Sequence, residues 1–292
     1  MRQFFQFITL SLLLLGAAQA RSLQEIKQSR ELRVCLAPIH PSYSSVEPSD
    51  CKDGCSFSGP VHEQSLAFAQ SLGQGVQAKF MRVGWDEQFF DQSGKTVKEG
   101  SYTPRLLASG RCDFFPNNLT KIDWRLKKLD FVILRPNRNM VIVHAAQKSS
   151  IKKQADLAGK SSAVEMNSSW HGWLLASNQA DFAHKPIKLA LLPTQQSFHA
   201  VDAGTVDFIV TDADMAFWAV RNQLKHAQVA FPVGPLEEIG WAFAKQDKDL
   251  QAAVQSFFDA QRNDPNSAIN QSWQKHFGTR LTDFTTLMLS IK

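Results

Sequence analysis

The sequence of 292 residues lacks the motifs that mark several common enzyme classes. It contains no nucleophile-elbow serine in a Ser–His–Asp order, no His-Glu-x-x-His zinc spacing and no glycine-rich phosphate loop. Its formal net charge is +5, and basic residues cluster at most as pairs such as Lys127-Lys128 and Lys152-Lys153. Nucleic-acid surfaces need larger basic patches. We therefore expect no cofactor, no metal, no catalytic residue and no nucleic-acid partner.

Long apolar runs are also missing, apart from one at the amino terminus. Arg2 precedes the apolar stretch from Phe4 to Leu15, and Ala18-Gln19-Ala20 fits a small-x-small cleavage site. This pattern predicts a signal peptide over residues 1–20. A membrane anchor is the alternative, but the run is short for a span and has no stop-transfer flank. With no cysteine near the cleavage site, we expect a periplasmic protein without a lipid anchor.

Cysteine is scarce, with four residues in the chain. In an exported protein, four cysteines indicate disulfides rather than zinc. Cys51 and Cys55 lie in one polar loop, so we predict a local bridge between them. Cys35 and Cys112 each lie in an apolar run, where buried free thiols that pack as small hydrophobic groups are the plainer interpretation. The sequence leaves the state of that second pair open.

Strands alternate with helices along the chain, which predicts an α/β fold. Strands are expected at 32–37, 76–83, 131–134, 140–145, 162–165, 187–192, 207–211 and 240–244. Arg135-Pro136-Asn137 is expected to break a strand where the chain first crosses to a second lobe, and the run from Val229 to Val233 is expected to return it. The predicted lobes are therefore 21–135 with 233–292, and 136–232.

One stretch, Gly110 to Arg125, carries the pattern of a ligand site. A short apolar run is expected to end at Pro116, because proline has no N–H for a strand ladder. The polar side chains that follow are Asn117, Asn118 and Thr120. A helix is expected to begin near Asp123, with Arg125 in its first turn. Polar groups at a strand end beside a helix N-terminus can receive an anion, and arginine offers a fork for a carboxylate.

A second copy of this pattern runs from Ala203 to Asp212 and repeats the glycine, the aspartate three residues later, the phenylalanine and the polar strand end. The first copy supplies the cation of Arg125, and the second supplies the anion of Asp212. Two lobes that present side chains of opposite charge to each other indicate a zwitterionic ligand held between them. Either Asp212 or Asp214 could cap the following helix; we assign Asp214 to the cap and Asp212 to the ligand.

These features resemble the family 3 extracellular solute-binding proteins, which have the two-lobed type II periplasmic binding fold and serve ABC importers of polar amino acids. Leu23 to Val34 resembles the family's opening helix and strand, and Ala155 to Lys160 its entry into the second lobe. The resemblance implies a discontinuous first lobe and a cleft between lobes. It implies ligand contacts from Asn117, Asn118, Thr120, the carboxylate-binding Arg125, the turn Asn167-Ser168-Ser169, and Asp212, which holds the amino group.

The sequence departs from the family pattern after its first strand. The family often has an aspartate and an aromatic residue there, whereas this chain has Ala37 and His40, with Tyr43 nearby. We include His40, Tyr43 and Trp85 as candidate pocket residues; Trp85 and Trp170 could stack on a ligand or pack in the core. Phe277 to Phe284 also resembles the regulatory binding module of membrane-bound lytic transglycosylase F.

We therefore expect a monomer that binds an amino-acid-like solute by hinge closure and delivers it to an inner-membrane ABC permease. A sensory or regulatory module for amino acids or cell-wall fragments is the main alternative. A third is a dehydratase of the same fold class, in which Glu165 and Asp212 would act as acid and base.

Overall fold

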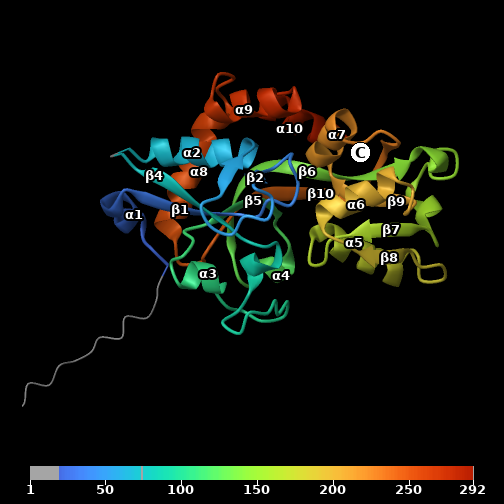
Figure 1. Cartoon of the computed structure of the whole chain (residues 1–292), viewed down its shortest axis with the longest axis horizontal. Coiled ribbons are helices and arrows are strands. Elements are labelled where there is room, and N and C mark those ends of the chain that lie inside the picture. Colours follow the sequence, from blue (N-terminus) through green and yellow to red (C-terminus); the bar gives the residue numbers. More distant parts are fainter. Residues whose placement is uncertain (1–19, 74, 292) are drawn as a thin grey trace, which may run out of the picture.

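The computed structural model describes residues 20–73 and 75–291, and it shows two α/β lobes side by side (Figure 1). The predicted signal peptide lies, except for its last residue, outside the described residues. Within the described ranges, no helix is both long enough and apolar enough to cross a membrane. Arg21, the first residue of the predicted mature chain, is anchored, because its guanidinium forms an ion pair of 3.3 Å with buried Asp113.

The first lobe is built from the amino-terminal part of the chain and one late helix. Its elements are α1 (Leu23–Ser29), β1 (Glu31–Leu36), β2 (Ser45–Glu47), β3 (Ser56–Ser58), α2 (Pro60–Ser71), β4 (Gln77–Arg82), η1 (Asp86–Phe89), α3 (Arg105–Ala108), β5 (Phe115–Thr120), α4 (Asp123–Leu126) and α8 (Lys248–Arg262). Strands β1 and β4 pair in parallel, and β2 and β3 form a short antiparallel ribbon. A bridge from Val34 to Phe114 joins β1 to the start of β5.

The second lobe contains the middle of the chain. Its elements are η2 (Ala145–Gln147), η3 (Gln154–Leu157), β7 (Ser161–Val164), α5 (Ser169–Gln179), β8 (Lys188–Leu191), α6 (Thr194–Asp202), β9 (Phe208–Asp212) and α7 (Ala213–Asn222). The last helices, α9 (Ala268–Phe277) and α10 (Leu281–Ser290), lie across the junction toward α7 (Figure 1).

Two long antiparallel strands join the lobes: β6 (Asp130–His144) and β10 (Ala227–Phe243). They lie at the centre of a six-stranded sheet of order β5-β10-β6-β9-β7-β8. The predicted break at Arg135-Pro136-Asn137 is wrong, because these residues lie inside β6 and Pro136 pairs with Glu238 of β10. The ladder instead shifts register on β10 between Val233 and Glu237. The lobe limits proposed from the sequence fall within these two strands.

The prediction that Pro116 ends a strand is also wrong. Pro116 is the second residue of β5, which forms one edge of the six-stranded sheet. The pairing between β5 and β10 is irregular between Gly240 and Ala242, so the register skips beside the proline. Proline is tolerated at such edge positions, because no donor is missed. Gly240 is needed at this crossing, because a Cβ there would lie 2.2 Å from the carbonyl oxygen of Val132.

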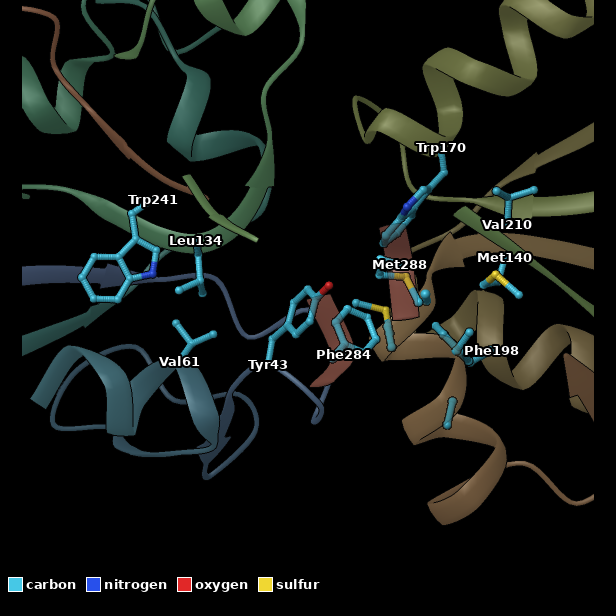
Figure 2. Packing of buried hydrophobic residues seen from close by; sticks show 14 of the residues in the cluster. Tyr43, Val61, Leu134, Met140, Trp170, Phe198, Val210, Trp241, Phe284 and Met288 are labelled. Atoms are coloured by element: carbon cyan, nitrogen blue, oxygen red, sulfur yellow. The ribbon is translucent and has the colours of Figure 1, made fainter. Parts of the chain in front are cut away.

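The main apolar core runs through both lobes rather than stopping at the junction (Figure 2). Figure 2 shows Trp241 and Val61 on the first-lobe side and Phe198 and Val210 on the second-lobe side. Phe284 of α10 lies between these groups and is buried. The C-terminal helix therefore contributes to the core where the long strands cross between lobes.

The structure contains two disulfides. The predicted bridge between Cys51 and Cys55 is confirmed. Cys35 and Cys112 form a second bridge, so the free-thiol interpretation of that pair is wrong. Both residues lie in a smaller apolar cluster of the first lobe, where β1 approaches the segment before β5. Two apolar runs that are 77 residues apart were brought together by strand pairing, which local sequence does not encode.

Candidate functional site

A narrow cavity of about 10 Å³, roughly the room of one water molecule, lies where the lobes meet. Its walls come from the loop after β1, the end of β5 with α4, the N-terminus of α5 and the end of β9. The lining residues are Ile39, Tyr43, Trp85, Asn117, Asn118, Thr120, Arg125, Ser168, Ser169, Trp170 and Asp212. The cavity therefore collects most of the candidate residues identified in the sequence, from both lobes.

Arg125 is a buried cation on the first-lobe side of this cavity, with 1% of its surface exposed. Its guanidinium donates to the carbonyl oxygens of Thr120 at 3.0 Å and Asn167 at 3.2 Å. It lies over the rings of Trp85, Phe89 and Trp124, at 5.0 to 5.5 Å from their centroids. Among residues 20–73 and 75–291, no carboxylate forms an ion pair with it.

Burial lowers the pKa of Arg125 to about 10, which leaves it charged at neutral pH. A buried charge without a counter-ion is costly, by several kcal/mol. Carbonyl oxygens and aromatic faces offset part of that cost, because both present negative partial charge to the cation. The remaining guanidinium N–H groups can donate to an anionic group of a ligand.

The second lobe brings the N-terminus of α5 to the same cavity. Ser168 is the N-cap, and its hydroxyl accepts from the His171 N–H at 3.0 Å, which is the usual role of a serine at this position. The N–H groups at the start of a helix have no carbonyl partner within it. Asn167, just before the cap, has a positive φ of 62° that turns the chain into the helix. This end therefore offers donors and a positive dipole to an anion.

The two lobes contact each other directly around the cavity. The Thr120 hydroxyl donates to the Ser169 hydroxyl at 3.1 Å, and the Asn167 amide donates to Asp86 at 3.0 Å. The bond from Arg125 to the Asn167 carbonyl oxygen also joins the lobes. The structure is therefore a closed arrangement of the lobes.

Asp212 lies at the end of β9 on the second-lobe side and is 2% exposed. Three neutral donors contact its carboxylate: the Tyr43 hydroxyl at 2.7 Å, the Trp170 indole N–H at 2.9 Å and the Asn137 amide at 3.0 Å. Burial, and secondly the nearby charge of Asp214, raise its pKa to about 6. In the described part of the chain, no cation forms an ion pair with Asp212.

Asp214 does not cap α7, so that assignment is wrong. The helix begins at Ala213, which puts Asp212 in the N-cap position, although its side chain makes no capping bond. Asp214 is fully buried and forms an ion pair with Arg135 at 2.5 Å, and it also accepts from Tyr43 at 3.1 Å. Arg135 belongs to β6, so this buried pair ties a strand that crosses between lobes to the second lobe.

Two candidate residues, Asn117 and His40, have other roles in the structure. The Asn117 side chain lines the cavity, but its amide is occupied by the Ala37 N–H, the Cys35 carbonyl oxygen and Gln88. His40 is not part of the cavity lining; it is buried against Phe198 and Trp218 of the second lobe.

Glu165 also lies outside the cavity lining, and its carboxylate accepts from the N–H and hydroxyl of Thr194. Its separation from the cavity gives no support to a catalytic pair of Glu165 with Asp212. Trp170 lines the cavity, and its indole N–H donates to Asp212. This polar contact comes in addition to the two roles considered from the sequence, stacking on a ligand and packing in the core.

Sequence reasoning missed Asn137, which it treated only as a strand breaker. Asn137 donates to Asp212, and its oxygen accepts from the Ala213 N–H at 3.2 Å. Its position follows from the antiparallel register of β6 and β9, in which Asn139 pairs with Asp212. No local pattern around Asn137 indicates that register.

Comparison with solved structures identifies the fold. An ancestral amino acid-binding protein, described as a precursor of cyclohexadienyl dehydratase, is 22% identical, with a TM-score of 0.68 over 87% of this chain and 98% of that chain. A Streptococcus mutans structure from a study of glutathione import is 18% identical, with a TM-score of 0.70 over 86% and 95%. An arginine-bound amino acid ABC transporter substrate-binding protein of Streptococcus pneumoniae is 19% identical, with a TM-score of 0.68 over 87% and 98%.

These structural matches establish the two-lobed type II periplasmic binding fold, as the sequence predicted. No protein-family model matches the chain. Among curated proteins, the membrane-bound lytic murein transglycosylase F of Desulfosudis oleivorans is 27% identical over 203 residues. That match covers 69% of this chain and 40% of the relative, so the chain spans less than half of that protein's length.

Proposed function

We propose that this chain, as a two-lobed type II periplasmic binding fold, binds a small zwitterionic solute in the periplasm and delivers it to an ABC importer. The ligand is an amino acid or a close relative of one. The observation that carries the proposal is a pair of buried, opposite charges, Arg125 and Asp212, that line one cavity from separate lobes and have no ion-pair partner among the described residues.

In this proposal the ligand carboxylate binds the free donors of Arg125 and the first N–H groups of α5, and the ligand ammonium binds Asp212. A bound zwitterion therefore supplies both missing counter-charges at once. Because the two groups belong to different lobes, the ligand makes all of its contacts only when the lobes are closed. Binding then shifts the population toward closure, and a permease recognises the closed form.

The first test is a thermal-shift screen with the twenty amino acids and with cell-wall peptides. A ligand that binds only the native state raises its apparent stability, so saturable stabilisation by a zwitterion is expected. The matched variants are Arg125→Met, which keeps much of the side-chain volume between the aromatic rings, and Lys127→Met, which removes a partly exposed cation two residues away.

Titration calorimetry should show that Arg125→Met weakens binding by about 30- to 5,000-fold, the equivalent of about 2–5 kcal/mol for an unpaired charge. Lys127→Met should bind like the parent protein. Failure of every zwitterion to bind the parent protein, or full affinity in Arg125→Met, would overturn the proposal.

A second candidate function is regulation, in which the same cleft senses amino acids or cell-wall fragments without transport. The match to the lytic murein transglycosylase favours this candidate, because that protein is named for action on the cell wall. The two candidates share the cleft and differ in partner. Uptake of a radiolabelled solute, compared between cells with and without the protein, separates them. Loss of uptake without the protein supports import, because a regulatory module is not needed for uptake.

A further inference from the structure

Most polar groups of the cavity are already engaged within the protein. The Tyr43 hydroxyl and the Trp170 indole bond to Asp212, the Thr120 hydroxyl bonds to Ser169, and the Ser168 hydroxyl donates to the Glu165 carbonyl oxygen and caps α5. The Asn117 amide is likewise occupied. These groups shape the cavity, and few of them remain to select among ligands.

Besides Arg125 Nε, two buried polar atoms of the cavity-lining residues have no hydrogen-bond partner in the described part of the chain. They are the indole Nε1 of Trp85, a donor, and the side-chain Oδ1 of Asn118, an acceptor. Asn118 is 9% exposed, and its φ of 50° holds it in a left-handed conformation at the end of β5. A buried donor or acceptor without a hydrogen bond destabilises a protein by about 1–3 kcal/mol, so a ligand that bonds to both atoms would relieve this cost.

The same walls contain no charge other than Arg125 and Asp212. Of the acids near the cavity, Asp86 accepts from Asn167 and Glu165 accepts from Thr194, and Glu237 lines a different cavity, on the side of Arg135 and Pro136. A cationic ligand side chain would therefore find no free carboxylate in the cavity, and an anionic one would compete for the single guanidinium. The cavity of about 10 Å³ is far below the roughly 300–1,000 Å³ of pockets for drug-sized ligands, so the lobes must move apart to admit any ligand.

Resting on the proposed function, we infer that the ligand carries an uncharged amide in addition to its carboxylate and ammonium. The amide oxygen accepts from the Trp85 indole, and the amide N–H donates to Asn118 Oδ1. Trp85 and Asn118 are thus the residues that determine specificity. An amide of this kind is present in the side chains of glutamine and asparagine and in the peptide bond of a dipeptide.

The test is titration calorimetry of the mature chain with L-glutamine, L-asparagine and alanyl-glycine, against L-glutamate, L-aspartate, L-arginine and L-norleucine. At least one amide ligand should bind about 10- to 100-fold more tightly than its acid or apolar counterpart, the equivalent of one unmatched buried polar group. The side-chain amides and the dipeptide are separate arms, so the result also shows which source of the amide is bound.

Two variants address the inference directly. Trp85→Phe removes the indole N–H and should reduce the preference for the amide over norleucine by about tenfold. Asn118→Asp keeps the shape and tolerates the left-handed backbone, and it should weaken amide ligands while improving L-lysine or L-ornithine. Asn266→Asp, at an exposed position in the loop before α9, is the matched control and should leave the selectivity order unchanged.

Each outcome has a distinct meaning. Preference for an amide ligand that is lost in Trp85→Phe and Asn118→Asp supports the inference. Equal or tighter binding of a charged or apolar amino acid overturns it and leaves the proposed function intact. Absence of binding by every zwitterion overturns both.

Discussion

At the scale of single residues, Asp212 is unusual because three neutral donors, rather than a cation, hold it. Arg135 is nearby, but its ion pair is with Asp214, and Tyr43 bonds to both carboxylates. The hydrogen bonds to Asp212 therefore stabilise its carboxylate without an ion pair that would balance its charge. Desolvation raises its pKa to about 6, which is the expected direction for a buried carboxyl group without a cation.

This raised pKa predicts a pH dependence of binding. In the unliganded folded protein, ionisation of Asp212 lowers stability as the pH rises from about 4, where the unfolded chain titrates, to about 6. A ligand ammonium favours the ionised form. Ligand affinity should therefore be constant above about pH 7 and should fall by up to about tenfold per pH unit below pH 6, as measured by calorimetry between pH 5 and 8.

The matched variants for this prediction are Asp212→Asn and Glu237→Gln. Burial raises the pKa of Glu237 to about 7, so it is a second titrating group beside the cleft. Asp212→Asn should bind weakly and without this pH dependence, whereas Glu237→Gln should keep the fall below pH 6. A parent protein whose affinity is the same at pH 5 and pH 8 would contradict the assigned role of Asp212.

At the scale of elements, the two disulfides fix different parts of the first lobe. The bridge between Cys35 and Cys112 holds β1 against the segment before β5, and the Asn117 side chain completes this contact by bonding to the backbone of Cys35 and Ala37. The strand end that carries the proposed ligand-binding residues is thereby fixed. The bridge between Cys51 and Cys55 closes a loop of residues 51–55, none of which lines the cavity.

Loop length predicts their relative contributions to stability. In the chain-entropy description, a loop closed over 77 residues contributes about 4.5 kcal/mol, and one closed over 4 residues about 2 kcal/mol. Replacing Cys35 and Cys112 together by alanine should therefore lower the free energy of unfolding by roughly twice as much as replacing Cys51 and Cys55, measured by urea denaturation. A larger loss from the short loop would show that its bridge acts through the folded loop instead.

At the scale of the whole molecule, the lobes are joined by contacts outside the ligand cavity. His40, in the loop after β1, is 1% exposed and packs between Phe198 and Trp218 of the second lobe, with ring centroids at 4.4 and 5.3 Å. Its Nε2 also lies 3.0 Å from the amide oxygen of Gln223. Burial lowers its pKa to about 3, so the ring is neutral near pH 7. Opening of the lobes must remove this ring from its pocket.

This contact predicts that His40→Ala weakens closure without changing what is bound. The radius of gyration of the unliganded protein in small-angle X-ray scattering should rise, because the open form becomes more populated. Affinity should fall by the same fraction for every ligand, since only the binding-competent population changes. His184→Ala, at an exposed position of the second lobe, is the control. A changed order of ligand preference would instead place His40 in the binding site.

The sequence by itself determined the α/β alternation and the local bridge of Cys51 with Cys55. Each depends on residues close together in the chain, where periodicity and turns act. It also singled out Arg125 and Asp212 through two similar strand ends. In the sheet, β5 and β9 run toward each other from the two lobes, so these ends meet at the junction.

Only the tertiary structure decided the partners of those residues. The ion pair of Arg135 with Asp214, the contact of Asn137 with Asp212 and the bridge of Cys35 with Cys112 all follow from strand register and lobe packing. Pro116 and Pro136 stay within strands because neighbouring strands skip or pair around them. Such pairings join segments far apart in the chain, and burial then sets which charges are matched and which remain for a ligand.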